Sequence, residues 1–267
     1  MFESIGRSWT LMKQSFSVLK KDKELLVFPV LSGIAAFIVL ISFAVPIFLA
    51  DLADSFLIYP ILLLFYIISY FVVIFFNAAL VGAAMIRMGG EDPTIGDGLN
   101  IAFSNAKNIF LWAVVAGTVG MILRMLANKS KNNFIAGILV SIIGVAWTLL
   151  TYFVVPTIVV EQVGPLKAIK KSKKIISEKW RETVLGEIGF GGIQFLVLLP
   201  IIIVSAAVMI FVPVLFLPML LVLVAAIILV SLVFSAVGGI FSAAVYYASV
   251  TGKNPEGIDI SIAMQGK

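Results

Sequence analysis

The sequence predicts an all-α, polytopic membrane protein in which six transmembrane helices form three hairpins. Its residues are 61% hydrophobic and only 12% charged, and the mean hydropathy is +1.15. A soluble domain of 267 residues has no core large enough to hide that much apolar surface, whereas lipid does hide it. Long apolar runs also recur six times along the chain. We therefore expect residues 1–267 to form one integral membrane domain.

Each apolar run is long enough for a span, since about 20 residues of helix cross the hydrocarbon core of about 30 Å. Polar turns and breakers separate the runs, such as residues 51–54 after the first and 89–93 after the second. Pro200 predicts a kink within the fifth. The expected spans are residues 25–50, 56–88, 109–127, 134–160, 183–211 and 219–250.

Lys and Arg are distributed unequally between the two sides of these spans. The N-terminal segment, the second and fourth gaps and the C-terminal tail hold 16 of the 19 basic residues, whereas Arg124, Lys129 and Lys131 lie on the opposite side. Positively charged segments stay in the cytoplasm. We therefore expect a multi-pass protein of the cell (cytoplasmic) membrane with both the N- and C-termini inside, which an even number of spans allows.

The cytoplasmic gaps carry apolar residues at spacings of three and four, the pattern of an amphipathic helix. A proline follows each even-numbered span, at Pro93, Pro165 and Pro255, where it suits the first turn of a helix. We interpret the unit as an amphipathic interfacial helix followed by a hairpin, repeated near residues 1–92, 93–164 and 165–254. The alternative is that any hairpin protein needs polar turns between its spans. The three stripes are Phe2, Ile5, Trp9, Met12, Phe16 and Leu19; Ile95, Leu99, Ala102, Ala106 and Ile109; and Leu166, Ile169, Ile176 and Trp180, with Lys173 interrupting.

The third of these helices has a basic face opposite its apolar stripe. Such a face suits docking to anionic membrane lipid or to an acidic partner protein. The alternative is an ordinary positive-inside anchor, which fixes topology and binds nothing specific. The residues on this face are Lys167, Lys170, Lys171, Lys174 and Arg181.

Uncharged polar residues lie within the spans, Asn77 and Gln194 foremost among them. They could line a path for a solute, or they could join helices by hydrogen bonds worth less than about 2 kcal/mol each. Titratable groups are scarce there, although Glu187 is about one turn inside the fifth span. Glu187 is the one candidate coupling site for a proton-driven carrier, and a span that started near Trp180 would place it deeper.

The chain contains no Cys and no His, which removes thiolate nucleophiles, His-based metal sites and imidazole chemistry. The glycines at 189–192 lack the Lys of a phosphate loop, and no group of residues suits intramembrane proteolysis. We therefore expect that the protein is not an enzyme, has no catalytic residues and binds no cofactor or metal. We also expect no nucleic-acid partner, because the basic residues lie at helix ends. Gly- and Ala-rich clusters suit close helix packing, either within the monomer or in a homo-oligomer.

Residues at the end of the fourth span and in its connector resemble a pattern of several prokaryotic six-helix membrane families. The pattern is a late proline, a Glu at the cytoplasmic end, then an Ala and a Ser on an amphipathic helix. It is found in the membrane domain attached to some glycerophosphodiester phosphodiesterases and in related uncharacterised families. Residues 4–31 also resemble one of these uncharacterised families. The resemblance implies this architecture and no active site, since the phosphodiesterase activity belongs to a separate soluble domain. The matching residues here are Pro156, Val159, Val160, Glu161, Pro165, Ala168, Ile169 and Ser172.

Together these features predict a non-enzymatic membrane module that organises lipids or partner proteins through its basic cytoplasmic helices. The alternative is a pore or permease for a small solute, which could be homo-oligomeric. A pore needs a continuous polar-lined path, whereas a module can be packed with apolar side chains throughout. The surroundings of Asn77 and Gln194 therefore help to separate the two functions.

The charge distribution predicts the topology directly. Reporter fusions after Lys267 and within residues 161–182 should read cytoplasmic, and a fusion near Asn132 should read external, because basic segments resist translocation. The measurement compares a reporter that is active only outside the cytoplasm with one that is active only inside. An external reading for residues 161–182 would contradict the six-span topology.

Overall fold

Helices account for all regular secondary structure in the part of the chain that the computed structural model describes, which is residues 2–52, 55–130, 133–178 and 180–261. For residues 2–5, 7–8 and 180–189 this description covers the backbone alone. The elements in order are α1 (Phe2–Lys21), the 3-10 turn η1 (Lys23–Leu26), α2 (Val27–Leu49), α3 (Ile58–Met88), α4 (Ile95–Ser104), α5 (Ala106–Lys129), α6 (Phe134–Thr151), α7 (Val154–Glu161), α8 (Pro165–Glu178), α9 (Trp180–Phe211), the 3-10 turn η2 (Pro213–Leu215) and α10 (Phe216–Thr251).

Six of the described helical segments are long and apolar enough to cross a membrane, which is the number expected from the sequence. The chain is accordingly a multi-pass membrane protein. Helix α9 runs through Pro200 without interruption and begins at Trp180, a few residues before the expected start of the fifth span. The six segments are Lys23–Leu49, Ile58–Met88, Ala106–Lys129, Phe134–Glu161, Phe190–Phe211 and Pro213–Thr251.

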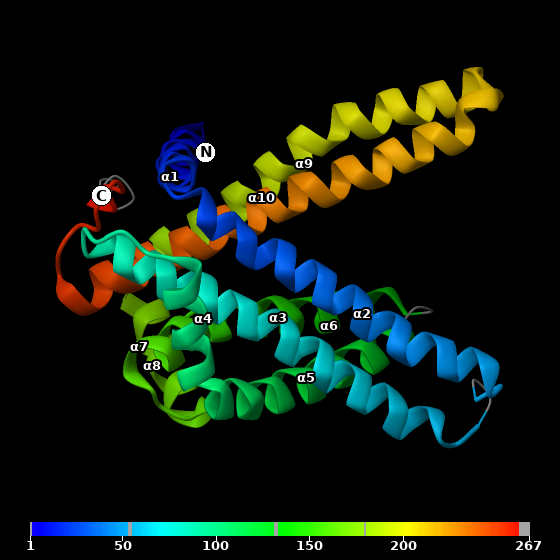
Figure 1. Cartoon of the computed structure of the whole chain (residues 1–267), viewed down its shortest axis with the longest axis horizontal. Helices are drawn as coiled ribbons and strands as arrows, with labels where there is room; N and C mark the ends of the chain where they lie inside the picture. The colour runs from blue at the N-terminus through cyan, green and yellow to red at the C-terminus, as the bar shows by residue number, and fades with distance from the viewer. Residues whose placement is uncertain (1, 53–54, 131–132, 179, 262–267) are drawn as a thin grey trace.

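The short helices gather at one end of the molecule, and the turns between the long helices lie at the other (Figure 1). Helix α2 returns into α3, and α9 returns through η2 into α10, so that the members of each pair lie side by side. The α9–α10 pair diverges from α2 and α3 toward the turns. We call the end with α1, α4, α7 and α8 the basal end, and the end with the turns the distal end.

The buried core lies at the basal end rather than along the whole length of the spans. The buried residues of α3 fall between 74 and 88, those of α10 between 236 and 246, and those of α5 between 109 and 117, while α6 has none. Toward the distal end large apolar side chains are exposed, such as Phe48 at 84% and Phe211 at 81%. This is the surface expected of helices whose neighbours are lipid chains.

The fourth span is broken, a feature that the apolar pattern does not indicate. Helix α6 ends at Thr151 and α7 begins at Val154. Pro156 explains the break, because its ring would clash with the carbonyl of residue 152 in a continuous helix. The N–H of Phe153 donates to Ser172 Oγ of α8 at 3.1 Å, and both residues are fully buried. A side chain from another helix thus satisfies a backbone group at the break.

Helix α4 begins with a capping box. Thr94 Oγ1 accepts from the Asp97 N–H at 3.1 Å, and Asp97 Oδ2 accepts from the Thr94 N–H at 3.0 Å. The hydrogen bonds from the Thr94 side chain and backbone lower the pKa of the Asp97 carboxyl. Their contribution to stability is therefore present at neutral pH and is lost as the pH falls through that lowered pKa. Glu24 Oε2 also accepts from the Ile95 N–H at 3.1 Å, which ties η1 to the same helix end.

Arg87 joins separate segments at the basal end. Its guanidinium pairs with Asp22, directly after α1, and with Asp92, shortly after α3. Asp22 is buried, with 6% of its side chain exposed, so this pair is shielded from solvent more than a surface pair. The carbonyl of Met88 accepts from the N–H of Glu256 at 3.3 Å. The chain after α10 is thereby attached to the end of α3.

The buried faces of α1 and α8 differ from the expected apolar stripes. Trp9 and Phe16 of α1 are 43% and 38% exposed, and Leu166 of α8 is 75% exposed. Hydrophobicity alone predicts that the large apolar side chains are the buried ones. Small side chains such as Ala168 and Ser172 are buried instead, because they allow the helices to approach closely. Phe2, Ile5 and Trp180 lie outside the described side chains. The buried residues are Leu11, Ser15, Val18 and Leu19 in α1, and Pro165, Ala168, Ser172, Ile175 and Ile176 in α8.

Gly98 of α4 packs so closely that no side chain fits. A Cβ at this position would lie 2.7 Å from the Ala79 carbonyl oxygen and 2.4 Å from Phe28 Cζ. Because a backbone oxygen cannot move aside easily, Gly98→Ala should destabilise the protein by about 1–3 kcal/mol. The measurement is the thermal unfolding temperature of the purified protein in detergent.

Gly96→Ala on the same helix is the matched control. Its Cβ would meet Thr94 Oγ1 at 3.6 Å, an ordinary contact, and alanine favours a helix over glycine. Equal unfolding temperatures for the two variants would contradict the packing described for Gly98.

Candidate functional site

Helix α8 carries the predicted basic face and is fixed to the basal end by specific contacts. Its Ser172 accepts the Phe153 N–H, as described above, and Ala168 is fully buried. Lys171 pairs with Glu161 at the end of α7. Glu161 Oε1 also accepts from Tyr246 Oη of α10 at 2.8 Å. One carboxylate therefore links α7, α8 and α10 and holds the orientation of α8.

These contacts account for the residues that resemble the membrane-family pattern. Pro156 sets the break before α7, Ser172 satisfies the Phe153 N–H at that break, and Ala168 permits the close approach of α8. Glu161 is the shared partner of Lys171 and Tyr246. In this chain these four residues therefore join the broken span to the connector helix α8.

Among the predicted basic residues, Lys171 is held in a partly buried ion pair, whereas the other lysines are exposed. Lys171 is engaged by Glu161, with 37% of its side chain exposed, and Lys174 lies 4.0 Å from Glu178 on the next turn. The side chain of Arg181 lies outside the described residues. We define the α8 basic surface as the exposed lysines Lys167, Lys170, Lys173 and Lys174.

The two polar residues singled out within the spans line the same cavity. Asn77 of α3 and Gln194 of α9 both border a cavity of about 470 Å³ between α2, α3, α9 and α10. Three serines of α10 lie on its wall at spacings of four and seven, together with Gly238. The polar residues of the wall are Ser32, Asn77, Tyr152, Gln194, Ser231, Ser235 and Ser242.

The polar groups of this cavity are only partly satisfied within the protein. Gln194 Nε2 donates to Ser231 Oγ at 3.3 Å. Asn77 is exposed to the cavity, and its amide has no hydrogen-bond partner among the described residues. An amide left without a partner in hydrocarbon costs several kcal/mol, on the order of 2–7. The cavity therefore suits water or the polar part of a bound molecule better than a lipid tail.

Glu187, the remaining predicted residue, lies on α9 about two turns before Gln194. Its side chain is outside the described residues, so its surroundings stay a prediction. No group of three or more acidic residues that could hold a metal ion occurs among the described residues.

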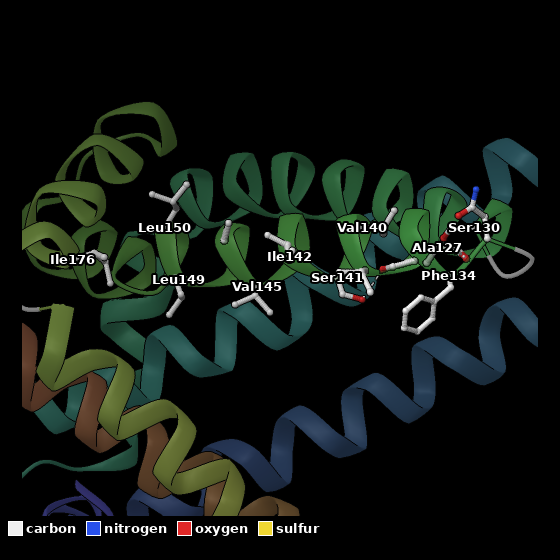
Figure 2. A pocket seen from close by; sticks show the side chains of 14 residues that line it. Ala127, Ser130, Phe134, Val140, Ser141, Ile142, Val145, Leu149, Leu150 and Ile176 are labelled. Atoms are coloured by element: carbon white, nitrogen blue, oxygen red, sulfur yellow. Dashed lines mark hydrogen bonds between the residues drawn. The ribbon is translucent and has the colours of Figure 1, made fainter. Parts of the chain in front are cut away.

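A second hollow is apolar and lies along α6. This groove of about 960 Å³ runs beside Ile142, Val145 and Leu149, with Ile176 of α8 at one end (Figure 2). Because α6 buries no residue, this side chain row belongs to the surface that meets lipid.

The sequence analysis did not identify some of the residues that line the polar cavity. Ser231, Ser235 and Ser242 recur on one face of α10, a helical period that marks a shared face. Ser32 and Tyr152 carry no such signal, because each is a single residue on its own segment.

Comparison with known proteins gives one match. The model of DUF6159, described as a family of unknown function, matches residues 56–256. No curated protein and no solved structure matches the chain.

The cavity predicts that position 77 of α3 is accessible to water. Because the chain has no Cys, Asn77→Cys would carry a single thiol. Its reaction with a water-soluble methanethiosulfonate reagent in proteoliposomes should be at least about tenfold faster than that of a lipid-facing thiol, since the thiolate needs water. The matched control is Leu64→Cys on the same helix, a position that is 51% exposed. Equally slow labelling of both positions would contradict a hydrated cavity.

Proposed function

The chain belongs to DUF6159, a family of unknown function, and we propose from its own geometry that it is a non-enzymatic membrane module that organises anionic lipids at its basal end. The observation that carries the proposal is the α8 basic surface. Its four exposed lysines stand on a helix whose opposite side is fixed by Ser172 and Glu161. A rigid helix presents its charges in one direction without the entropy loss that a mobile loop would suffer.

In this proposal the basal end faces the cytoplasm. The α2–α3, α5–α7 and α9–α10 segments then form three hairpins across the cell membrane, and α1, α4 and α8 are interfacial helices. The distribution of Lys and Arg along the sequence supports this orientation, because 16 of the 19 belong to the N-terminal segment, the second and fourth gaps and the C-terminal tail. The threefold sequence repeat fits the same arrangement, with one short helix before each pair of long ones.

A protein partner is the other occupant of the α8 basic surface that the charge would allow. An acidic cytoplasmic protein would meet the same lysines.

Contacts between copies of the chain are a further route to assembly. Among its small residues, Gly82 and Gly239 pack within the monomer against Ile101 and Leu80, whereas Gly192 has open space around it. Gly192 therefore has room for a seam between copies, as Gly144, Gly191 and Gly238 also do.

Neutralising the α8 basic surface should remove a preference for anionic lipid. Each Lys near an anionic surface contributes about 1 kcal/mol. The measurement is the rise in unfolding temperature that phosphatidylglycerol gives over phosphatidylcholine for the purified protein, which should fall by at least half and lose its salt dependence. Lys171 stays in place because it pairs with Glu161. The variant changes Lys167, Lys170, Lys173 and Lys174 to Gln.

The matched control removes the same charge from exposed lysines elsewhere at the basal end. A loss confined to the α8 variant supports the proposal. Equal losses in both variants would leave only a positive-inside anchor, and an unchanged response would favour an acidic partner protein. The control variant changes Lys21, Lys23, Lys107 and Lys253 to Gln.

The second candidate function is a binding site or permease for a small polar solute. The observation that favours it is the cavity beside the Asn77 amide, for which the described part of the chain supplies no hydrogen-bond partner, because an apolar packed module has no need of such a group. Glu187→Gln tests ion coupling in this case. Solute flux that a pH gradient drives in proteoliposomes, and that this substitution abolishes in folded protein, would make the chain a secondary transporter.

A further inference from the structure

A groove at the basal end has a basic, aromatic rim and an apolar floor. It has a volume of about 510 Å³ and lies between α1 on one side and α9 and α10 on the other. Helix α1 contributes Lys13 and Lys20, which are both exposed. Helices α9 and α10 contribute only aliphatic and aromatic side chains, including Val197 and Val233. None of the described residues that line the groove is acidic.

The two lysines are positioned by neighbouring aromatic rings. Lys13 Nζ lies 5.1 Å from the centre of the Trp9 ring, and Lys20 Nζ lies 5.0 Å from the centre of the Phe16 ring. Such cation–π contacts hold an ammonium group at the rim and leave its other side open. Because Trp9 and Phe16 are themselves part of the groove, the charges stand directly above its apolar floor.

The residues around the groove indicate how it lies relative to the membrane. Trp9 is 43% exposed on a helix at the basal end, and aromatic side chains with lysines are typical of headgroup depth. Val197, 41% exposed, lies on α9, and the exposed Val204 continues the apolar surface toward the distal end. A ligand that fits must therefore be anionic at one end and long and apolar at the other.

We propose that this groove binds one anionic phospholipid, with its phosphate at the rim that carries Lys13 and Lys20 and an acyl chain along Val197 and Val233. The proposal rests on the proposed function only in taking the chain as a lipid-binding membrane protein. It adds a defined site for a single lipid, separate from the α8 basic surface, which attracts headgroups without an enclosing wall.

The test is native mass spectrometry of the full chain in detergent, titrated with phosphatidylglycerol and with phosphatidylcholine. We expect one phosphatidylglycerol to bind at least about fivefold more tightly than phosphatidylcholine. Lys13→Gln with Lys20→Gln should abolish this preference, and Lys13→Arg with Lys20→Arg should keep it, because the charge is preserved. Val197→Trp should fill the groove and weaken binding with both lysines intact. Unfolding temperatures near that of the unaltered protein verify that the variants are folded.

The control for charge alone is Lys107→Gln with Lys253→Gln, two exposed lysines outside both the groove and the α8 basic surface, which should leave this binding unchanged. An equal loss in that control would overturn the site, since general surface attraction would then explain the result. Full binding in the Val197→Trp variant would also overturn it, and equal affinity for the two lipids would exclude recognition of the phosphate charge. If the four-lysine α8 variant keeps its lipid response while the α1 variant loses its bound lipid, the groove stands and the proposed role of α8 fails.

Discussion

The structure depends on one requirement, that backbone N–H and C=O groups within hydrocarbon find partners inside the protein. Continuous helices meet it along most of the described chain, and side chains meet it at several helix ends and at the break of the fourth span, notably at the basal end. There the Phe153 N–H reaches Ser172 Oγ, and the start of α4 is satisfied by Thr94, Asp97 and Glu24. The segments between the spans are therefore part of the solution, because Ser172 of α8 completes the break of the fourth span and Glu24 of η1 completes the start of α4.

Two charged clusters then fix the short helices in position. Arg87 joins the segments after α1 and α3 through Asp22 and Asp92. Glu161 joins α7, α8 and α10 through Lys171 and Tyr246. In both clusters a charge near the end of a span meets its partner on a following or preceding connector. Such pairs are costly to break by removing one member, because the remaining charge is left partly buried. The exposed lysines of α1 and α8, such as Lys13 and Lys170, take part in neither cluster.

The sequence was sufficient for the number of spans and for several of their ends, and insufficient for the break in the fourth span and for the packing of the connector helices. Apolar length and polar breakers placed the end of the second span at Met88 and the start of the fourth at Phe134, as the helices have them. Which side of α8 is buried was not predictable, because packing favoured Ala168 over the larger Leu166. Asn77 and Gln194 were both selected for polarity, yet periodicity along one helix cannot show that two helices bring them to the same cavity.

The concentration of the core at the basal end has a consequence for how the protein fits different bilayers. In α10 no buried residue precedes Ala236, and the distal part of that helix packs mainly against α9. A membrane a few ångströms thicker or thinner can then be matched by tilting of the distal segments, at a cost of fractions of a kcal/mol per ångström. The basal packing does not have to change in response. The fold therefore separates a rigid anchoring layer from compliant spans, and hydrophobic mismatch is absorbed where few specific contacts exist.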